Sequence, residues 1–551
     1  MFRVTSYKLQ VTSPPPYPPH KCGGRIALLL IFILLFVSIQ AQSGVIISGE
    51  NTATYSYRTE DDVNNNYFEN EFKFRLDQRY FSFGMSFRAE LPRYDPIEPS
   101  DILTPSIIHT EWVDRYVQLN LDNFFLKAGT LEESFGSGIV FRSWYDRELD
   151  IENRLEGAQA VFTYENFRLT GVYGNLREYE VFTQTQQTNK NDLVIGGDLE
   201  YRPFSFLNFG ISVLEYKQET QNFWGEFERY THFNTFGGRI GVMGDFYDIN
   251  LEHSLIKRFH DIVAPVSEGS AFYSTANFYV GDFTLSGGYK RYDKYSLYVY
   301  NDMETYTYKE FHYPLADLPT LNNYDELLTT YTNKDYEEGF MGEIRFIPNF
   351  DNEILVNYAE SWGREKDTWH RNIYAEYKKN FSNFNFTFDI EFLDKEYPHL
   401  VNNYVDPEHA DYGKKLYSGE MWLRPSLYFD FHQFFIPTSI TLAYEYTEER
   451  LTFEFDGDFK KQYNNKPQLQ IENRFTDDLS LAIIFENEFK NISEIDKSEL
   501  FIGGEIAYSI LNHTDLKLFI GKELGGKVCR NGTCVTQPPF EGVRLGLTTR
   551  F

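Results

Sequence analysis

Apolar and polar residues alternate with a period of two along most of this chain, and this pattern constrains the fold more than any other feature. In residues 71–77, which read EFKFRLD, the apolar side chains fall on one face and the charged ones on the other. In the next segment Phe81, Phe83 and Phe87 share a face, and Arg88 lies on the opposite one. Successive side chains of a β-strand point to opposite faces, so the alternation predicts half-buried strands. No long window after the N-terminal region has helical periodicity, and we expect an all-β fold.

The pattern predicts about 24 strands, within a range of roughly 22 to 26. Their cores are expected to begin near Gly44, Tyr67, Phe81, Arg115, Asn123, Gly157, Phe167, Asn191, Phe206, Asn234, Tyr247, Ala271, Phe283, Gly339, Glu353, Thr368, Phe384, Leu416, Thr438, Pro467, Leu479, Glu499, Thr514 and Gly542.

The connections between these strands alternate in length. Short turns are expected at Gln78-Arg79, Asp122, Asn166, Asp282, Asp477-Asp478 and Asn512-His513. Long links are expected over Pro92 to Asp114, Leu131 to Glu156, Asp293 to Glu338, Asp394 to Lys415 and Glu523 to Glu541. Transmembrane barrels combine short periplasmic turns with long extracellular loops, and closure pairs every backbone polar group inside lipid. The sequence therefore predicts a transmembrane antiparallel up-and-down β-barrel.

The N-terminal region has the pattern of a secretory signal. Lys21 and Arg25 precede an apolar run from Ile26 to Ile39, which is too short to span a bilayer comfortably, and Ala41 is a suitable cleavage residue. We expect residues 1–41 to be a signal peptide with an extended n-region and residues 42–551 to be a single outer-membrane barrel. An uncleaved anchor is the alternative.

The last ten residues, GVRLGLTTRF, also alternate and end in Phe551. A final strand that ends in phenylalanine resembles the C-terminal signal that the barrel-assembly machinery reads in outer-membrane proteins. The expected location is the bacterial outer membrane, and the expected partners are this machinery and outer-membrane lipid.

The formal net charge of −29 argues against nucleic acid as a partner, because phosphate contacts need basic patches. The acidity fits solvated loops, and divalent cations that bridge to anionic lipid headgroups are the alternative.

Two of the three cysteines remain after loss of the signal. Cys529 and Cys534 flank a turn that contains Asn-Gly, which predicts a disulfide within one outer loop. A zinc site would need two further ligands, and none lies nearby. Acidic pairs at Asp61-Asp62 and Asp456-Gly457-Asp458 do not have the spacing of a calcium loop. We therefore predict no metal and no cofactor.

The densest charged segment runs from Glu132 to Glu156 and contains the glycines of Phe135-Gly136-Ser137-Gly138. It follows the fifth expected strand, where general porins fold a loop into the lumen. Opposed charges in such a constriction would set selectivity. A solvated outer loop, or a salt-bridge network on the wall, is the alternative. The candidate constriction residues are Arg142, Arg147, Arg154, Glu132, Glu133, Asp146, Glu148 and Asp150.

The longest link, Asp293 to Glu338, is crowded with tyrosines, including Tyr295 and Tyr336. These rings could bind a surface protein or glycan partner. The alternative, which we favour, is that they belong to an interfacial girdle or pack within the loop.

Several motifs resemble an uncharacterised outer-membrane barrel family of Bacteroidota. They are Leu126-Lys127-Ala128-Gly129, Phe135-Gly136-Ser137-Gly138, RSWYDRELDIENRLEG at 142–157, the Cys529–Cys534 spacing, Pro538-Pro539-Phe540-Glu541-Gly542 and Arg550-Phe551. The resemblance implies the fold and the location, and it brings no activity and no catalytic residue.

Two functions remain open from the sequence. The first is a porin-like channel for small hydrophilic solutes, whose lumen is open or filled by inward loops, because strand alternation begins too close to the expected cleavage site for a globular plug. The second is a non-conducting scaffold or accessory barrel of a surface or secretion assembly. No histidine pairs with a nucleophile in a way that singles out a catalytic site, so we do not expect an enzyme.

Overall fold

The computed structural model describes residues 44–59, 65–91, 109–146, 151–180, 185–188, 193–221, 227–260, 267–295, 336–363, 369–400, 415–431, 436–451, 460–492, 495–510, 513–530, 533–537 and 539–551. The signal peptide expected over residues 1–41 lies outside these residues. Within the described ranges, no helix has the length and apolar character needed to cross a membrane.

Most of the described chain forms one antiparallel sheet. Its first wall strands are β1 (Ile46–Arg58), β2 (Asn66–Gln78), β3 (Phe81–Leu91), β4 (His109–Asn120), β5 (Phe124–Leu131), β10 (Leu155–Tyr164), β11 (Phe167–Glu180), β13 (Leu193–Phe204), β14 (Leu207–Gln221), β15 (Phe227–Gly244), β16 (Tyr247–His260) and β17 (Ser267–Val280). The wall continues with β18 (Phe283–Asp293), β19 (Tyr336–Asn349), β20 (Asn352–Trp362), β21 (Trp369–Asn380), β22 (Phe384–Leu400), β23 (Lys415–Phe431), β24 (Thr438–Leu451), β25 (Lys460–Arg474), β26 (Leu479–Ile492), β27 (Ile495–Ile510), β28 (Thr514–Glu523) and β31 (Phe540–Arg550).

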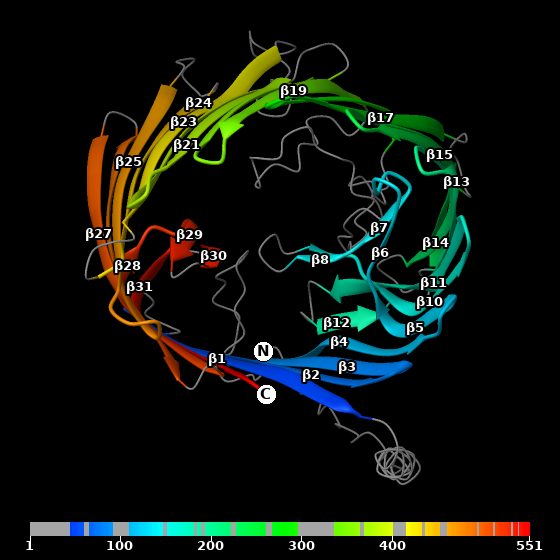
Figure 1. Cartoon of the computed structure of the whole chain (residues 1–551), viewed down its shortest axis with the longest axis horizontal. Coiled ribbons are helices and arrows are strands. Elements are labelled where there is room, and N and C mark those ends of the chain that lie inside the picture. The colour runs from blue at the N-terminus through cyan, green and yellow to red at the C-terminus, as the bar shows by residue number, and fades with distance from the viewer. Residues whose placement is uncertain are drawn as a thin grey trace, which may run out of the picture.

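These strands form a closed barrel of 24 strands (Figure 1). A further strand of the sheet, β12 (Thr185–Thr188), pairs only with β11 and is not part of the wall. Wall strands pair with their neighbours in chain order, and β31 pairs with β1 to close the ring. The predicted strand number and fold class are confirmed, and each expected strand core corresponds to one wall strand.

The closure involves the last residue of the chain. The amide of Gly49 donates to the carbonyl of Phe551 at 2.9 Å, and the amide of Phe551 donates back at 3.0 Å. The Phe551 ring stacks against Phe72 on the outer face, with centroids 6.2 Å apart. Phe551 is therefore part of the seam, whereas its role as an assembly signal stays a prediction.

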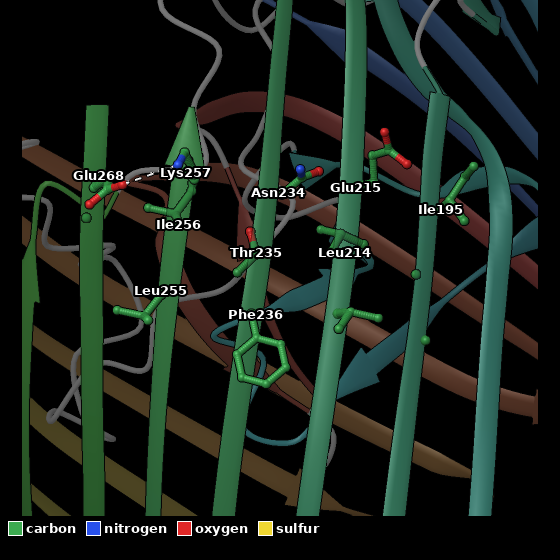
Figure 2. Close-up of a pocket in the computed structure, with 14 residues that line it drawn as sticks. Ile195, Leu214, Glu215, Asn234, Thr235, Phe236, Leu255, Ile256, Lys257 and Glu268 are labelled. Atoms are coloured by element: carbon green, nitrogen blue, oxygen red, sulfur yellow. Dashed lines mark ion pairs between the residues drawn. The ribbon is translucent and has the colours of Figure 1, made fainter. Parts of the chain in front are cut away.

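The two faces of the wall differ as the alternation predicts. On the outer face Ile211, Phe236 and Leu255 are 50%, 53% and 51% exposed. Ser212 follows Ile211 and Thr235 precedes Phe236, and both of these side chains point inward and are buried. Figure 2 shows the outward Phe236 and Leu255 and the inward Thr235. The outer face is thus apolar here, and the inner face carries polar side chains beside apolar ones such as Phe233 and Ile256.

Some strands begin earlier than expected, at the end nearest the long links. β15 begins at Phe227 and β25 at Lys460, each several residues before its expected core. The early part of β25 reads KKQYNN and shows no apolar alternation. It is extended because it pairs with residues 446–451 of β24, a contact that local sequence does not reveal.

Besides β12, six short strands of the described residues lie off the wall. They are β6 (Glu133–Phe135), β7 (Phe141–Ser143), β8 (Tyr145–Asp146) and β9 (Ile151–Glu152), between β5 and β10, and the hairpin β29 (Gly526–Arg530) and β30 (Thr533–Gln537), between β28 and β31. In the view down the barrel, β6, β7, β8, β29 and β30 lie inside the ring (Figure 1). The described strands of these two links therefore lie inside the ring.

Candidate functional site

The candidate site is the inner segment, which we define as the described residues 132–146 and 151–154. β6 and β7 pair as a short hairpin whose tip contains two glycines. Gly136 and Gly138 have φ values of 59° and 94°, which glycine adopts at little cost. The Gly138 amide donates to the Phe135 carbonyl at 3.0 Å and closes the tip. The glycines thus provide the sharp bend that brings the chain back along the inside of the wall.

Apolar side chains fix the inner segment to the wall. Phe135, Ile139, Val140 and Phe141 are each at most 1% exposed. They belong to one buried cluster with wall side chains that include Val172, Leu176, Val194, Leu214, Phe233 and Ile256. Burial of one such side chain contributes about 1.5–3 kcal/mol. The segment is therefore held by a hydrophobic core of its own, on the inner face of β11–β16.

Two wall glycines allow this close packing. A Cβ atom at Gly237 would lie 2.4 Å from Cγ2 of Val140, and one at Gly196 would lie 3.0 Å from the Phe135 ring. Larger residues at either position would push the segment away from the wall. The lack of side chains at these two glycines thus leaves room for the inner segment against the wall.

Hydrogen bonds also hold the tip of the inner segment in one orientation. The Ser137 amide donates to Oε2 of Glu252 on β16 at 2.9 Å. The Tyr295 hydroxyl donates to the Ile139 carbonyl at 3.0 Å and lies 2.7 Å from the Ser254 hydroxyl. These contacts fix the tip of the segment against β16 and the end of β18.

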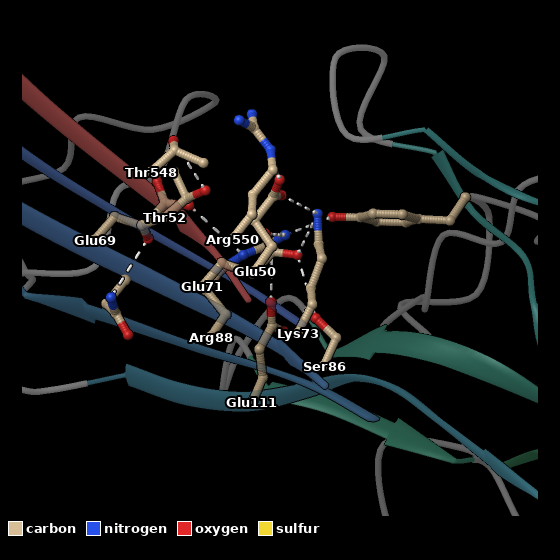
Figure 3. A network of polar contacts seen from close by, with 12 residues as sticks. Glu50, Thr52, Glu69, Glu71, Lys73, Ser86, Arg88, Glu111, Thr548 and Arg550 are labelled. Atoms are coloured by element: carbon tan, nitrogen blue, oxygen red, sulfur yellow. Dashed lines mark hydrogen bonds and ion pairs between the residues drawn. The ribbon is translucent and has the colours of Figure 1, made fainter. Parts of the chain in front are cut away.

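The other part of the segment reaches a different portion of the wall. Arg88 on β3 donates to the Tyr145 hydroxyl at 3.1 Å. The same guanidinium pairs with Glu111 at 2.8 Å and Glu71 at 3.2 Å, and these wall residues are shown in Figure 3. The inner segment therefore links β3 with β16, so it spans part of the lumen.

The charged candidates have different surroundings. Arg154 is 3% exposed, lies 3.6 Å from Glu132 and stacks over the Tyr145 ring at 4.3 Å. Arg142 lies over the Trp144 ring at 4.8 Å. Burial raises the pKa of Glu133, although the Ser134 amide and the Gln159 side chain both donate to it. Arg154 is thus buried in the segment, whereas Arg142 is half-buried.

Some predicted residues cannot be placed. Arg147, Glu148 and Asp150 lie outside the described residues, and only the backbone of Asp146 is described, as part of β8.

The register of β29 and β30 places Cys529 directly opposite Cys534. Opposed residues of an antiparallel pair have Cα atoms about 4.5–5.5 Å apart, which is within the range that a disulfide bridges. The two cysteine side chains lie outside the described residues, so the disulfide stays a prediction.

The cysteine hairpin is attached to the inner wall by Arg530. This side chain is 4% exposed, donates to Glu505 at 3.2 Å and also pairs with Glu523. It lies over the Phe519 ring at 5.0 Å. The hairpin expected in an outer loop is therefore docked inside the ring of strands.

The sequence does not identify the residues that hold the segment, namely Arg88 and Glu252 on the wall and Tyr295 just after β18. In the sequence, nothing distinguishes Tyr295 from the other tyrosines of its link. The apolar residues at 139–141 interrupt a strongly charged segment, and this pattern indicates that the segment packs against another part of the protein.

A family model that describes a family of unknown function, DUF6029, matches residues 25–342. This chain belongs to that family. The membership confirms the expectation of a family without an established activity. A comparison with curated proteins gives no match.

Solved structures give matches with low identity. The outer-membrane transporter YddB from Escherichia coli is 8% identical with a TM-score of 0.42, over 91% of this chain and 81% of that one. The FrpB iron transporter from Neisseria meningitidis is 10% identical with a TM-score of 0.42, over 92% and 82%. A mutant of the ferric enterobactin receptor PfeA from Pseudomonas aeruginosa is 9% identical with a TM-score of 0.44, over 92% and 81%.

Proposed function

We propose that this protein is an outer-membrane channel for small hydrophilic solutes, with a lumen narrowed by the inner segment. The observation that carries the proposal is the inner segment itself, which bridges two parts of a polar inner wall.

The outer-membrane location is supported by the contrast between the two faces of the wall. Side chains such as Ile211, Phe236 and Ile502 are exposed on the outer face. An apolar face of this extent is stable when it faces hydrocarbon, and a closed sheet leaves no unpaired strand edge there. Residues 1–41, as an export signal, would supply the route to this membrane.

A hydrophilic path is supported by the charged inner wall. Arg239 pairs with Asp198 at 2.7 Å, and Arg424 lies between Glu391 at 3.3 Å and Glu445 at 3.0 Å. Fixed charges of both signs on the wall favour water and polar solutes over apolar ones. Arg424, Glu391 and Glu445 lie on β22–β24, whereas Arg239 lies beside Gly136 at the tip of the inner segment.

The test is single-channel recording of the purified barrel in planar bilayers. We expect discrete conductance steps in wild type. Val140→Glu places a charge where the wall leaves no space and should undock the segment and increase the step size. Ser134→Glu, which adds the same charge at an exposed position of the same segment, is the matched control and should leave the step unchanged.

A second candidate is a non-conducting scaffold, and it is favoured by the inward position of both the inner segment and the cysteine hairpin. A folded wild-type barrel that never conducts, together with a conducting Val140→Glu variant, would support the scaffold and overturn the channel.

A further inference from the structure

The outer face of β13–β17 contains a groove of about 700 Å³ (Figure 2). The outward side chains that line it form two rows across the strands, as the strand register shows. The row nearer the short turns consists of Gly197, Val213, Phe236 and Leu255. The row nearer the long links consists of Ile195, Glu215, Asn234, Lys257 and Glu268.

The groove exists because side chains are missing from the wall at one place. Gly197 on β13 lies directly opposite Gly171 on β11. A Cβ atom at Gly171 would meet nothing within 4 Å, and the nearest atom to one at Gly197 would be 3.7 Å away. Beside them Ile195 and Val213 protrude, with 40% and 47% of their surfaces exposed. The recess is therefore open to whatever surrounds the barrel.

The two rows differ sharply in polarity. The row of Gly197 is wholly apolar, whereas the next row carries Lys257 and Glu268, which pair at 3.5 Å with 51% and 72% of their side chains exposed. On β14 Lys217 pairs with Glu215 at 2.9 Å. The groove thus crosses the boundary between the apolar outer face and a charged rim on the side of the long links.

We infer that this groove binds one membrane lipid with a phosphate-bearing headgroup. An acyl chain would lie along Gly197, Val213 and Phe236, where only an apolar occupant avoids an unpaired polar group. The phosphate would lie at the rim, where Lys257 and Lys217 supply ammonium donors. Their ion pairs with carboxylates are exposed and therefore weak, so a phosphate can compete for them.

A lipid fits the groove better than a second copy of this chain. A flexible acyl chain can follow a concave surface, whereas the same recess on a two-fold partner would face it and leave a void, with its loss of contacts. The inference uses the outer-membrane location of the proposed function but does not depend on conduction.

The experiment is native mass spectrometry of the full-length protein extracted from outer membranes in mild detergent. We expect wild type to retain one phosphate-bearing lipid. Gly197→Leu fills the recess and should reduce the retained lipid by at least about fivefold, because each methylene that loses its contact weakens binding. Gly171→Leu, on the adjacent strand β11, also adds a side chain at the recess and should reduce the retained lipid as well. Lys257→Gln should reduce retention of phosphate-bearing lipid while leaving the fold unchanged.

The matched control is Gly342→Leu on β19. A Cβ atom there also meets nothing within 4 Å, so the same side chain is added to the outer face away from the groove. Equal lipid retention by Gly197→Leu and Gly342→Leu overturns the inference. So does a wild-type dimer that Gly197→Leu converts to a monomer, since the groove would then be an interface between copies. Heat-dependent migration in gels verifies that each variant forms a barrel, and its failure in wild type would contradict the membrane location separately.

Discussion

Replacing Phe135 with alanine should release the inner segment from the wall while the barrel stays closed. Phe135 is 1% exposed, and its ring lies 5.0 Å from the ring of Phe141, centroid to centroid. Truncation of a buried phenylalanine costs about 3–5 kcal/mol, and loss of an aromatic pair adds about 0.5–1.5 kcal/mol. Even the lower end of that sum raises the undocked population more than about a hundredfold. The wall strands lose no backbone pairing, because the segment is not part of the barrel sheet.

Limited trypsin digestion measures this release, because Arg142 lies within the segment and becomes accessible when the segment undocks. We expect faster cleavage after Arg142 in Phe135→Ala than in wild type, and a larger single-channel conductance. Phe236→Ala is the matched control, since Phe236 is 53% exposed on the outer face and contributes nothing to docking. Unchanged cleavage and conductance in a folded Phe135→Ala variant would refute the view that apolar packing holds the segment in the lumen.

Three further predictions concern the seam, the hairpin and the lumen. Gly49→Leu should displace the C-terminal phenylalanine, because a Cβ atom there would lie 2.3 Å from its ring, and the fraction of heat-modifiable barrel should fall. Gly44→Leu, with nothing within 4 Å of its Cβ, should not change that fraction. Mass spectrometry of unreduced protein should find the two hairpin cysteines linked, with a stabilising effect of at most about 2–3 kcal/mol, and free thiols in fresh membranes would contradict this. Exchange of Arg142 and Arg147 for glutamate should shift the reversal potential towards cation selectivity, and an unchanged potential would remove this segment as the selectivity element.

The strands were predictable because their signal is local. A period of two needs only a few consecutive residues, such as Phe81, Phe83 and Phe87, to show which face is apolar. The boundaries were less predictable where the sequence is polar throughout. β25 begins at Lys460 because β24 pairs with it there, and no residue between 460 and 466 indicates that contact by itself.

The candidate site was predictable only in part. Its position after the fifth strand and its glycines indicated a loop that can turn inward, and the segment does turn inward. A prediction based on charge does not find the residues that hold the segment against the wall, which are the apolar Phe135, Ile139 and Val140. Of the charged candidates, Arg154 is buried within the segment. A charged side chain carries no sequence mark that separates a lumen-facing position from a buried one.

The sequence by itself determined that this chain forms antiparallel strands, about 24 of them, and which of their residues face outward, because each of these follows from neighbours along the chain. Only the tertiary structure decided where the long links go. Ile139 and Tyr295 are separated by 156 positions, yet a hydrogen bond joins them inside the barrel. Arg530 at the end of β29 donates to Glu505 on β27, although the whole of β28 lies between them in the chain. Such contacts form only when neighbouring strands have curved into a wall, because the curved wall brings segments that are distant in sequence to the same enclosed space.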